Sequence, residues 1–133
     1  MILVDSSVWI DFFAGKKSIH TDILFNSIEQ SDDICICGLI LAEVLQGVKS
    51  DKEFERVKGI LLPLIYLPIT KAMFVKSASI YRIIRKHGKT IRSPIDCMIA
   101  SICIEHEVRL LHNDNDYDII AHYSYLQIAN TAR

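Results

Sequence analysis

The chain opens with the stretch MILVDSSVWID (residues 1–11), and this stretch sets the expectation for the fold. Its apolar run at residues 2–4 is typical of a short buried strand, and Asp5 follows that run directly. Ser6 and Ser7 then supply hydroxyl groups of the kind that favour the start of a helix. The stretch therefore predicts a buried strand that ends at an acidic residue and leads into a helix.

The same alternation of strand and helix continues along the rest of the chain. Strands alternating with helices predict an α/β fold with a mainly parallel central sheet. In such sheets, functional sites form beyond the carboxyl ends of the strands. After the first strand, further strands are expected at residues 34–37, 64–67, 109–112 and 125–128, and helices at residues 39–48, 51–62, 70–87 and 116–123, with an earlier one after Ser18 and another that begins at Ser93 and Pro94.

Length and composition indicate one globular domain over residues 1–133. Hydrophobic residues make up 50% of the 133 residues and charged residues 23%, which excludes intrinsic disorder. The formal net charge of -1 argues against a general coat for nucleic acid or anionic membrane, since such a coat needs a strong positive excess. The first residues lack the features of a secretory signal, and the densest apolar stretch is interrupted by Pro63 and Pro68. We therefore expect a soluble, cytoplasmic protein with no membrane partner.

The cysteines predict buried thiols. They form no CxxC pair and lie in apolar segments, which favours core packing over a zinc site or a disulfide framework. The four positions are Cys35, Cys37, Cys97 and Cys103.

Acidic residues follow several of the predicted strands or begin the helices after them. If the sheet is parallel, these carboxylates meet at one edge, where like charges either hold protons or bind a hard cation such as Mg²⁺ or Mn²⁺. Each acid has an ordinary alternative role as a helix cap, an exposed helix residue or part of a polar turn. Asp96 is the least ordinary, because an acid in the apolar stretch PIDCMIA is costly without a partner. The set is Asp5, Glu43, Asp96, Asp114 and Asp116.

Positive charge is concentrated in residues 71–92, which hold seven of the 15 basic residues and none of the 16 acidic ones. Such a segment is a candidate for binding nucleic-acid phosphates, and a solvated helix face is the alternative. The candidate phosphate-binding residues are those that lead toward Asp96: Arg82, Arg85, Lys86, Lys89 and Arg92.

Four stretches together resemble the acidic motifs of the PIN-domain nucleases: DSSVWID (5–11), AEVLQG (42–47), SPIDCMIA (93–100) and LHNDNDYD (111–118). The short length and the EVLQG phrase look like the VapC ribonuclease toxins of toxin-antitoxin pairs. The resemblance implies a PIN-like three-layer α/β/α sandwich and a magnesium-dependent endoribonuclease. Its acidic set would be Asp5, Glu43, Asp96 and Asp114, with Asp116 nearby.

Two residues depart from the fourth motif of that family, which usually carries Thr and Phe. Here His112 replaces the Thr and Tyr117 replaces the Phe. Tyr117 keeps the packing ring, and His112 is either a donor beside substrate phosphate or a structural residue. The acids of this motif are doubled, and we favour Asp114 over Asp116 as the direct metal ligand.

The expected reaction is hydrolysis by a metal-activated water, because the chain has no glycine-rich phosphate loop, CxxC pair or Ser-His-Asp order. Asp5 and Asp96 would bind the metal directly, and Glu43 would position or deprotonate the water. Asp114 would hold a second ion or outer waters, and Ser7 would donate a hydrogen bond or cap a helix. The products would carry 5′-phosphate and 3′-hydroxyl ends. A housekeeping RNA-processing nuclease and a catalytically silent binding module are the alternatives.

The resemblance also implies two protein partners. One is a small antitoxin whose C-terminal segment lies over the acidic residues and offers them an Arg or Lys. Apolar residues of the early helices would form its groove or, alternatively, pack in the core: Trp9, Phe12, Phe13 and Leu45. The other partner is a second copy of the chain in a symmetric homodimer.

Overall fold

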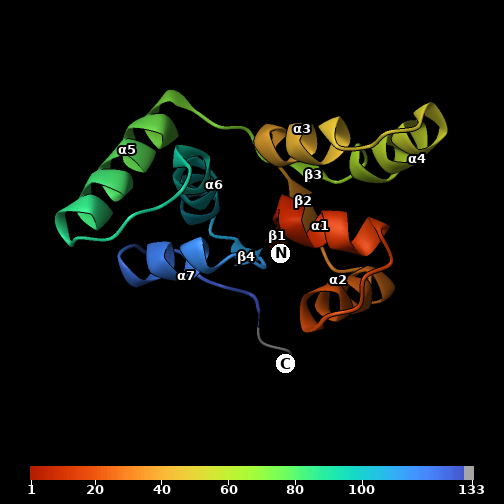
Figure 1. Cartoon of the computed structure of the whole chain (residues 1–133), viewed down its shortest axis with the longest axis horizontal. Coiled ribbons are helices and arrows are strands. Elements are labelled where there is room, and N and C mark those ends of the chain that lie inside the picture. The colour runs from red at the N-terminus through yellow and green to blue at the C-terminus, as the bar shows by residue number, and fades with distance from the viewer. Residues whose placement is uncertain (131–133) are drawn as a thin grey trace.

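The computed structural model describes residues 1–130, which form an α/β fold of seven helices and a four-stranded sheet (Figure 1). Helices follow each strand, as predicted, with two after each of the first three strands and one after the fourth. The elements are β1 (Ile2–Val4), α1 (Ser6–Phe13), α2 (Ile19–Glu29), β2 (Ile34–Ile36), α3 (Gly38–Gln46), α4 (Asp51–Leu61), β3 (Ile65–Tyr66), α5 (Lys71–Lys86), α6 (Pro94–Glu105), β4 (Arg109–Leu111) and α7 (Asn115–His122).

All strand pairs in the sheet are parallel, and the strand order is β3-β2-β1-β4. The central strand β1 pairs with β2 through Ile2 and Ile34, and with β4 through Val4 and Leu111. β1 and β2 are buried along their whole length. Burial on both faces explains why these strands are continuous apolar runs.

The strand expected at residues 125–128 is not formed. In its place the structure has a single bridge between Leu110 and Ile128, with hydrogen bonds from Leu110 N to Gln127 O and from Ala129 N to Leu110 O. The strand prediction was wrong because a pattern of apolar residues indicates that a segment is buried, but it does not indicate how many of its residues pair with the backbone of β4.

Local signals set most helix starts. Ser50, Thr70 and Ser93 each accept a hydrogen bond from a backbone N–H in the first turn of α4, α5 and α6. Gly88 follows α5 with φ of 75°, the left-handed conformation expected of a glycine after a helix. Gly38 begins α3, shortly after the end of β2. A Cβ there would lie 3.0 Å from the Tyr66 hydroxyl of β3, so the close approach favours glycine.

The helices flank the sheet in two groups. In Figure 1, α1 to α4 lie to the right of β1 and β4, and α5 to α7 lie to their left. Packing agrees with this division, because α1 contacts α2 and α3, and α6 contacts α5 and α7. The four cysteines are buried with free thiols, as predicted. Within residues 1–130, no helix has both the length and the apolar character needed to cross a bilayer.

Candidate active site

Asp5 lies at the carboxyl end of the central strand, and its carboxylate is held on both oxygens. Only 5% of the residue is exposed. Oδ2 accepts hydrogen bonds from the Ser7 backbone N–H at 3.3 Å and the Ser7 hydroxyl at 2.8 Å. Oδ1 accepts one from the Tyr117 hydroxyl at 3.0 Å. Asp5 therefore caps α1, as its ordinary role predicted, and also faces the edge of the sheet where the other acids gather.

Asp96 reaches this edge from the first turn of α6, which Ser93 and Pro94 begin. Burial, together with the nearby charges of Asp5, Asp114 and Asp116, raises the pKa of Asp96 to about 7. The apolar neighbours of Asp96 in sequence therefore correctly indicated an acid in an unfavourable environment.

The Tyr117 hydroxyl bridges two of the acids, lying 3.0 Å from Asp5 Oδ1 and 3.3 Å from Asp96 Oδ1. Burial raises the pKa of Tyr117 well above its usual range, so the hydroxyl stays protonated and able to donate. It has one proton and can donate to only one carboxylate at a time. A proton on Asp96 or a bound cation would relieve the remaining repulsion. The sequence analysis expected only a packing ring at Tyr117 and missed this contact, for which the change from Phe to Tyr was the available signal.

Glu43 approaches the same edge from α3, where it is half-buried. Burial raises the pKa of Glu43, and the charge of Asp5 adds to this effect. Asp5 and Glu43 are 38 residues apart in the chain, and this effect of the Asp5 charge on Glu43 agrees with the expectation that both lie at the same edge.

Asp114 and Asp116 complete the acidic edge at the start of α7. Asp114 is the N-cap of this helix, and its Oδ1 accepts the Asp116 backbone N–H at 3.0 Å. Carboxylate oxygens of Asp96, Asp114 and Asp116 all lie within 4.8 Å of one another. Oxygen donors at this spacing suit a hard cation that keeps several waters, so the residues fit Mg²⁺ or Mn²⁺.

His112 supports Asp114 from within the protein. Its side chain is 3% exposed, and its Nδ1 accepts the Asp114 backbone N–H at 3.1 Å. Because Nδ1 accepts, the ring proton is on Nε2, which lies 3.2 Å from Asp118 Oδ1. Burial lowers the pKa of His112, which keeps the ring neutral. These contacts favour the structural role for His112 over contact with substrate phosphate.

The predicted RNA-binding residues divide into two groups. Arg82, Arg85, Lys86 and Lys89 are exposed, and none of them forms an ion pair with an acidic residue in the part of the chain that the structure describes. Arg92 instead contacts Asp114 and Asp116.

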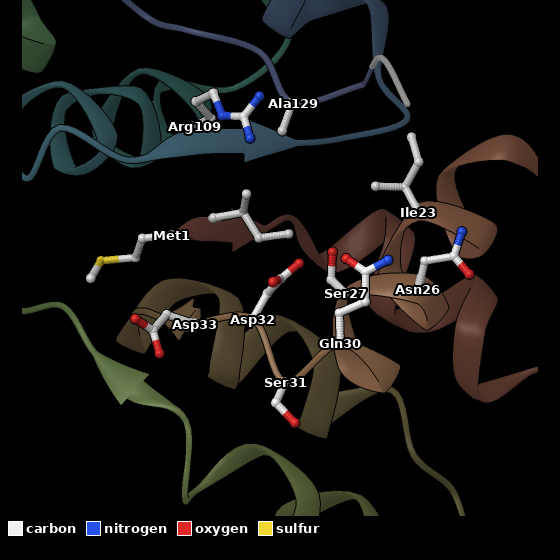
Figure 2. A pocket seen from close by; sticks show the side chains of 11 residues that line it. Met1, Ile23, Asn26, Ser27, Gln30, Ser31, Asp32, Asp33, Arg109 and Ala129 are labelled. Carbon is white, nitrogen blue, oxygen red and sulfur yellow. The ribbon is translucent and has the colours of Figure 1, made fainter. Parts of the chain in front are cut away.

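Hollows are also present away from the acidic edge. One, of about 520 Å³, is at the opposite edge of the sheet, where Met1, Asp33 and Arg109 mark the amino ends of three strands (Figure 2). Another is an apolar groove of about 390 Å³ between α1, α3 and α4, which we call the α1–α4 groove. Its lining includes Ile10, Phe13, Val44, Val48 and Val57.

For Trp9 and Phe13, the structure decides between the two uses that the sequence left open, groove lining and core packing. Phe13 lines the α1–α4 groove, whereas Trp9 does not and is only 1% exposed. Trp9 packs in the core against Phe12 and Phe13, with ring centroids 6.0 and 5.6 Å away.

A parallel sheet with acidic residues at its carboxyl edge is consistent with the family that the sequence motifs indicated. The family profile described as PIN domain matches residues 2–123. The chain therefore belongs to the PIN-domain family.

Within this family, the chain groups with the VapC ribonucleases. It is 35% identical to ribonuclease VapC11 of Mycobacterium tuberculosis over 132 residues, which is 98% of each chain. Its fold is similar to VapBC2 of Rickettsia felis, with a TM-score of 0.74, 19% identity and coverage of 96% and 97% of the two chains. It is also similar to a toxin-antitoxin complex from Klebsiella pneumoniae, with a TM-score of 0.68, 16% identity and coverage of 86% and 88%.

Proposed function

We propose that the protein is a metal-dependent endoribonuclease and the toxin of a type II toxin-antitoxin pair. The observation that carries this proposal is the convergence of five acidic residues on one sheet edge, three of them with oxygens within 4.8 Å of one another. The ribonuclease name of relatives 35% identical to this chain supports RNA as the substrate.

The acids of the site would act in distinct ways. When bound, Mg²⁺ supplies an activated water for attack on phosphorus and neutralises negative charge on the phosphate. Asp5 and Asp96 would bind the cation directly, with Asp114 and Asp116 adding a second ion or outer waters. Glu43 would orient the attacking water and accept its proton, a role that its raised pKa suits at neutral pH.

The residues around Asp5 would keep its carboxylate in place for this role. Ser7 and Tyr117 donate to its two oxygens from α1 and α7. Such hydrogen bonds to a ligand fix its orientation. Because water attacks rather than the ribose 2′-hydroxyl, the RNA products would carry 5′-phosphate and 3′-hydroxyl ends.

The test is an assay of RNA cleavage by the purified chain, followed by sequencing of the new 5′ ends. We expect cleavage with Mg²⁺ or Mn²⁺, none in excess EDTA, and 5′ ends that ligate without prior phosphorylation. Sequencing after induced expression in cells would identify the RNA. Cleavage that continues in EDTA would contradict the metal-dependent mechanism, and no cleavage under any condition would favour a silent binding module.

RNA would be held by the basic surface, which we define as Arg82, Arg85, Lys86 and Lys89. These exposed side chains belong to the end of α5 and the loop that leads to α6 and Asp96. Their freedom from acidic partners among residues 1–130 leaves them available to phosphates.

Replacing Arg85, Lys86 and Lys89 by Ala is expected to weaken RNA binding and to flatten its salt dependence. Each lost phosphate contact lowers the slope of log K against log salt by about 0.7 for single strands. Binding is measured by fluorescence anisotropy in EDTA at several salt concentrations. The control replaces Lys16, Lys17 and Lys49, which are exposed outside the basic surface, by Ala. If log K depends equally on log salt in the two triple variants, the basic surface is a solvated helix face that does not bind RNA.

The α1–α4 groove would bind an apolar helix of the antitoxin, whose following segment would place an Arg or Lys on the acids. Support comes from the groove's apolar lining and from the toxin-antitoxin complexes among structures of similar fold. We also propose a symmetric homodimer, for which the exposed Phe74 and Val75 of α5 offer apolar surface. A housekeeping RNA-processing nuclease is the alternative to a toxin, and growth arrest on expression distinguishes the two.

A further inference from the structure

Arg92 makes three contacts with the acidic edge from the loop that precedes α6. Its Nη2 donates to Asp114 Oδ2 at 2.9 Å. Its Nε and its backbone N–H both donate to Asp116 Oδ2, at 3.3 and 3.1 Å. One arginine therefore ties together two of the three carboxylates whose oxygens lie within 4.8 Å of one another.

The guanidinium uses the same oxygens that a cation would need. Asp114 Oδ1 accepts the Asp116 backbone N–H and Oδ2 accepts the Arg92 guanidinium, so both oxygens of this carboxylate already have a donor. Asp116 likewise gives one of its oxygens to Arg92. A divalent cation bound to Asp114 Oδ2 or Asp116 Oδ2 would be repelled by the positive charge of Arg92, which is hydrogen-bonded to the same oxygen.

The Arg92 side chain is also free to leave. It is 77% exposed, whereas the side chains of Asp114 and Asp116 are 23% and 13% exposed. Exposed ion pairs are weak, so the side chain can move into solvent at small cost. The backbone contact from Arg92 N to Asp116 does not involve the guanidinium, so it can hold the loop in place when the side chain moves.

We propose that Arg92 is a built-in counter-ion of the acidic edge, which a divalent cation must displace from Asp114 and Asp116. This inference rests on the proposed function for the presence of the metal. The basic surface would bind RNA phosphates, whereas Arg92 has a different role. It neutralises Asp114 and Asp116 when no metal is bound, and it thereby lowers their affinity for the metal. Release of the side chain would then place a positive charge beside the bound metal, where RNA phosphate arrives.

The test is the affinity of RNA-free protein for Mn²⁺, measured from the electron paramagnetic resonance signal of the free ion. Arg92→Ala is expected to bind Mn²⁺ about three- to tenfold more tightly than the original chain, since it removes a competitor that pairs with two carboxylates. Arg92→Lys keeps the charge but loses the two-acid contact, and we expect an intermediate affinity. Circular dichroism would confirm that each variant is folded, as the retained backbone contact predicts.

Lys17→Ala is the control, because it removes the same charge from an exposed side chain that lies outside the basic surface and has no acidic partner among residues 1–130. We expect its Mn²⁺ affinity to change by less than about twofold, since exposed charges at a distance are screened. Equal effects in Arg92→Ala and Lys17→Ala, or weaker binding by Arg92→Ala, would overturn the counter-ion role alone. If neither the original chain nor Arg92→Ala binds Mn²⁺, the metal-dependent function fails together with this inference.

Discussion

Replacing Asp5 or Asp96 by Asn is expected to lower RNA cleavage by at least about 100-fold while the fold survives. A bound metal supplies several kcal/mol of transition-state stabilisation, and each 1.4 kcal/mol is about tenfold in rate. Asn keeps the size of Asp but removes the charge that would hold the metal. The measurement is the single-turnover rate of cleavage at saturating RNA, so that weaker substrate binding does not contribute.

Asp96→Asn is also expected to stabilise the metal-free protein, which distinguishes lost chemistry from lost folding. Burial and the neighbouring acids raise the pKa of Asp96 to about 7, whereas an unfolded Asp titrates near 4. The folded state therefore binds the proton more tightly, and ionisation of Asp96 reduces stability as the pH rises from about 4 to 7. Asn does not ionise, so in EDTA its melting temperature should exceed that of the original chain more at pH 8 than at pH 5.

Asp33→Asn serves as the control for both measurements. Asp33 is an exposed acid at the opposite edge of the sheet, beside the hollow of Figure 2. The change should leave cleavage within about twofold of the original rate, as expected for a surface substitution away from the site. Undiminished cleavage by Asp5→Asn and Asp96→Asn would show that the acidic edge is not the catalytic site.

Replacing Ile10 by Asp is expected to abolish neutralisation by the antitoxin without reducing RNA cleavage. Ile10 lines the α1–α4 groove and is 48% exposed, so the free protein tolerates a charge there. A bound apolar helix would bury that carboxylate without a partner, which weakens binding by about 100-fold or more. The chain alone should arrest growth, the product of the reading frame immediately upstream should restore it, and the Ile10→Asp variant should arrest growth in the presence of both.

Ile19→Asp makes the same chemical change outside the groove. Ile19 is 59% exposed at the start of α2, where an acidic residue is favourable. This variant should still be neutralised. Continued neutralisation of Ile10→Asp would place the antitoxin elsewhere on the surface, and harmless overexpression of an active nuclease would favour RNA processing over a toxin.

The sequence predicted the parallel sheet and the acidic edge because both depend on local signals. Strands β1 and β2 are apolar runs, and Ser93 with Pro94 marks the start of α6. Once the strands are parallel, residues that follow them share one edge whatever their separation in the chain. This argument predicted that Asp5 and Glu43 lie at the same edge, and it did not depend on any side-chain contact.

Only the tertiary structure decided how the acids are held. Tyr117 donates to Asp5 across 112 residues of sequence, and Arg92 reaches Asp114 across 22. The sequence pattern alone also did not decide whether Trp9 is buried or whether the segment that pairs with Leu110 forms a full strand. Hydrophobic periodicity and capping signals act over a few residues, so they determine which elements form and in what order. Contacts between elements depend on how side chains pack once the helices lie on the sheet, and no local signal carries that information.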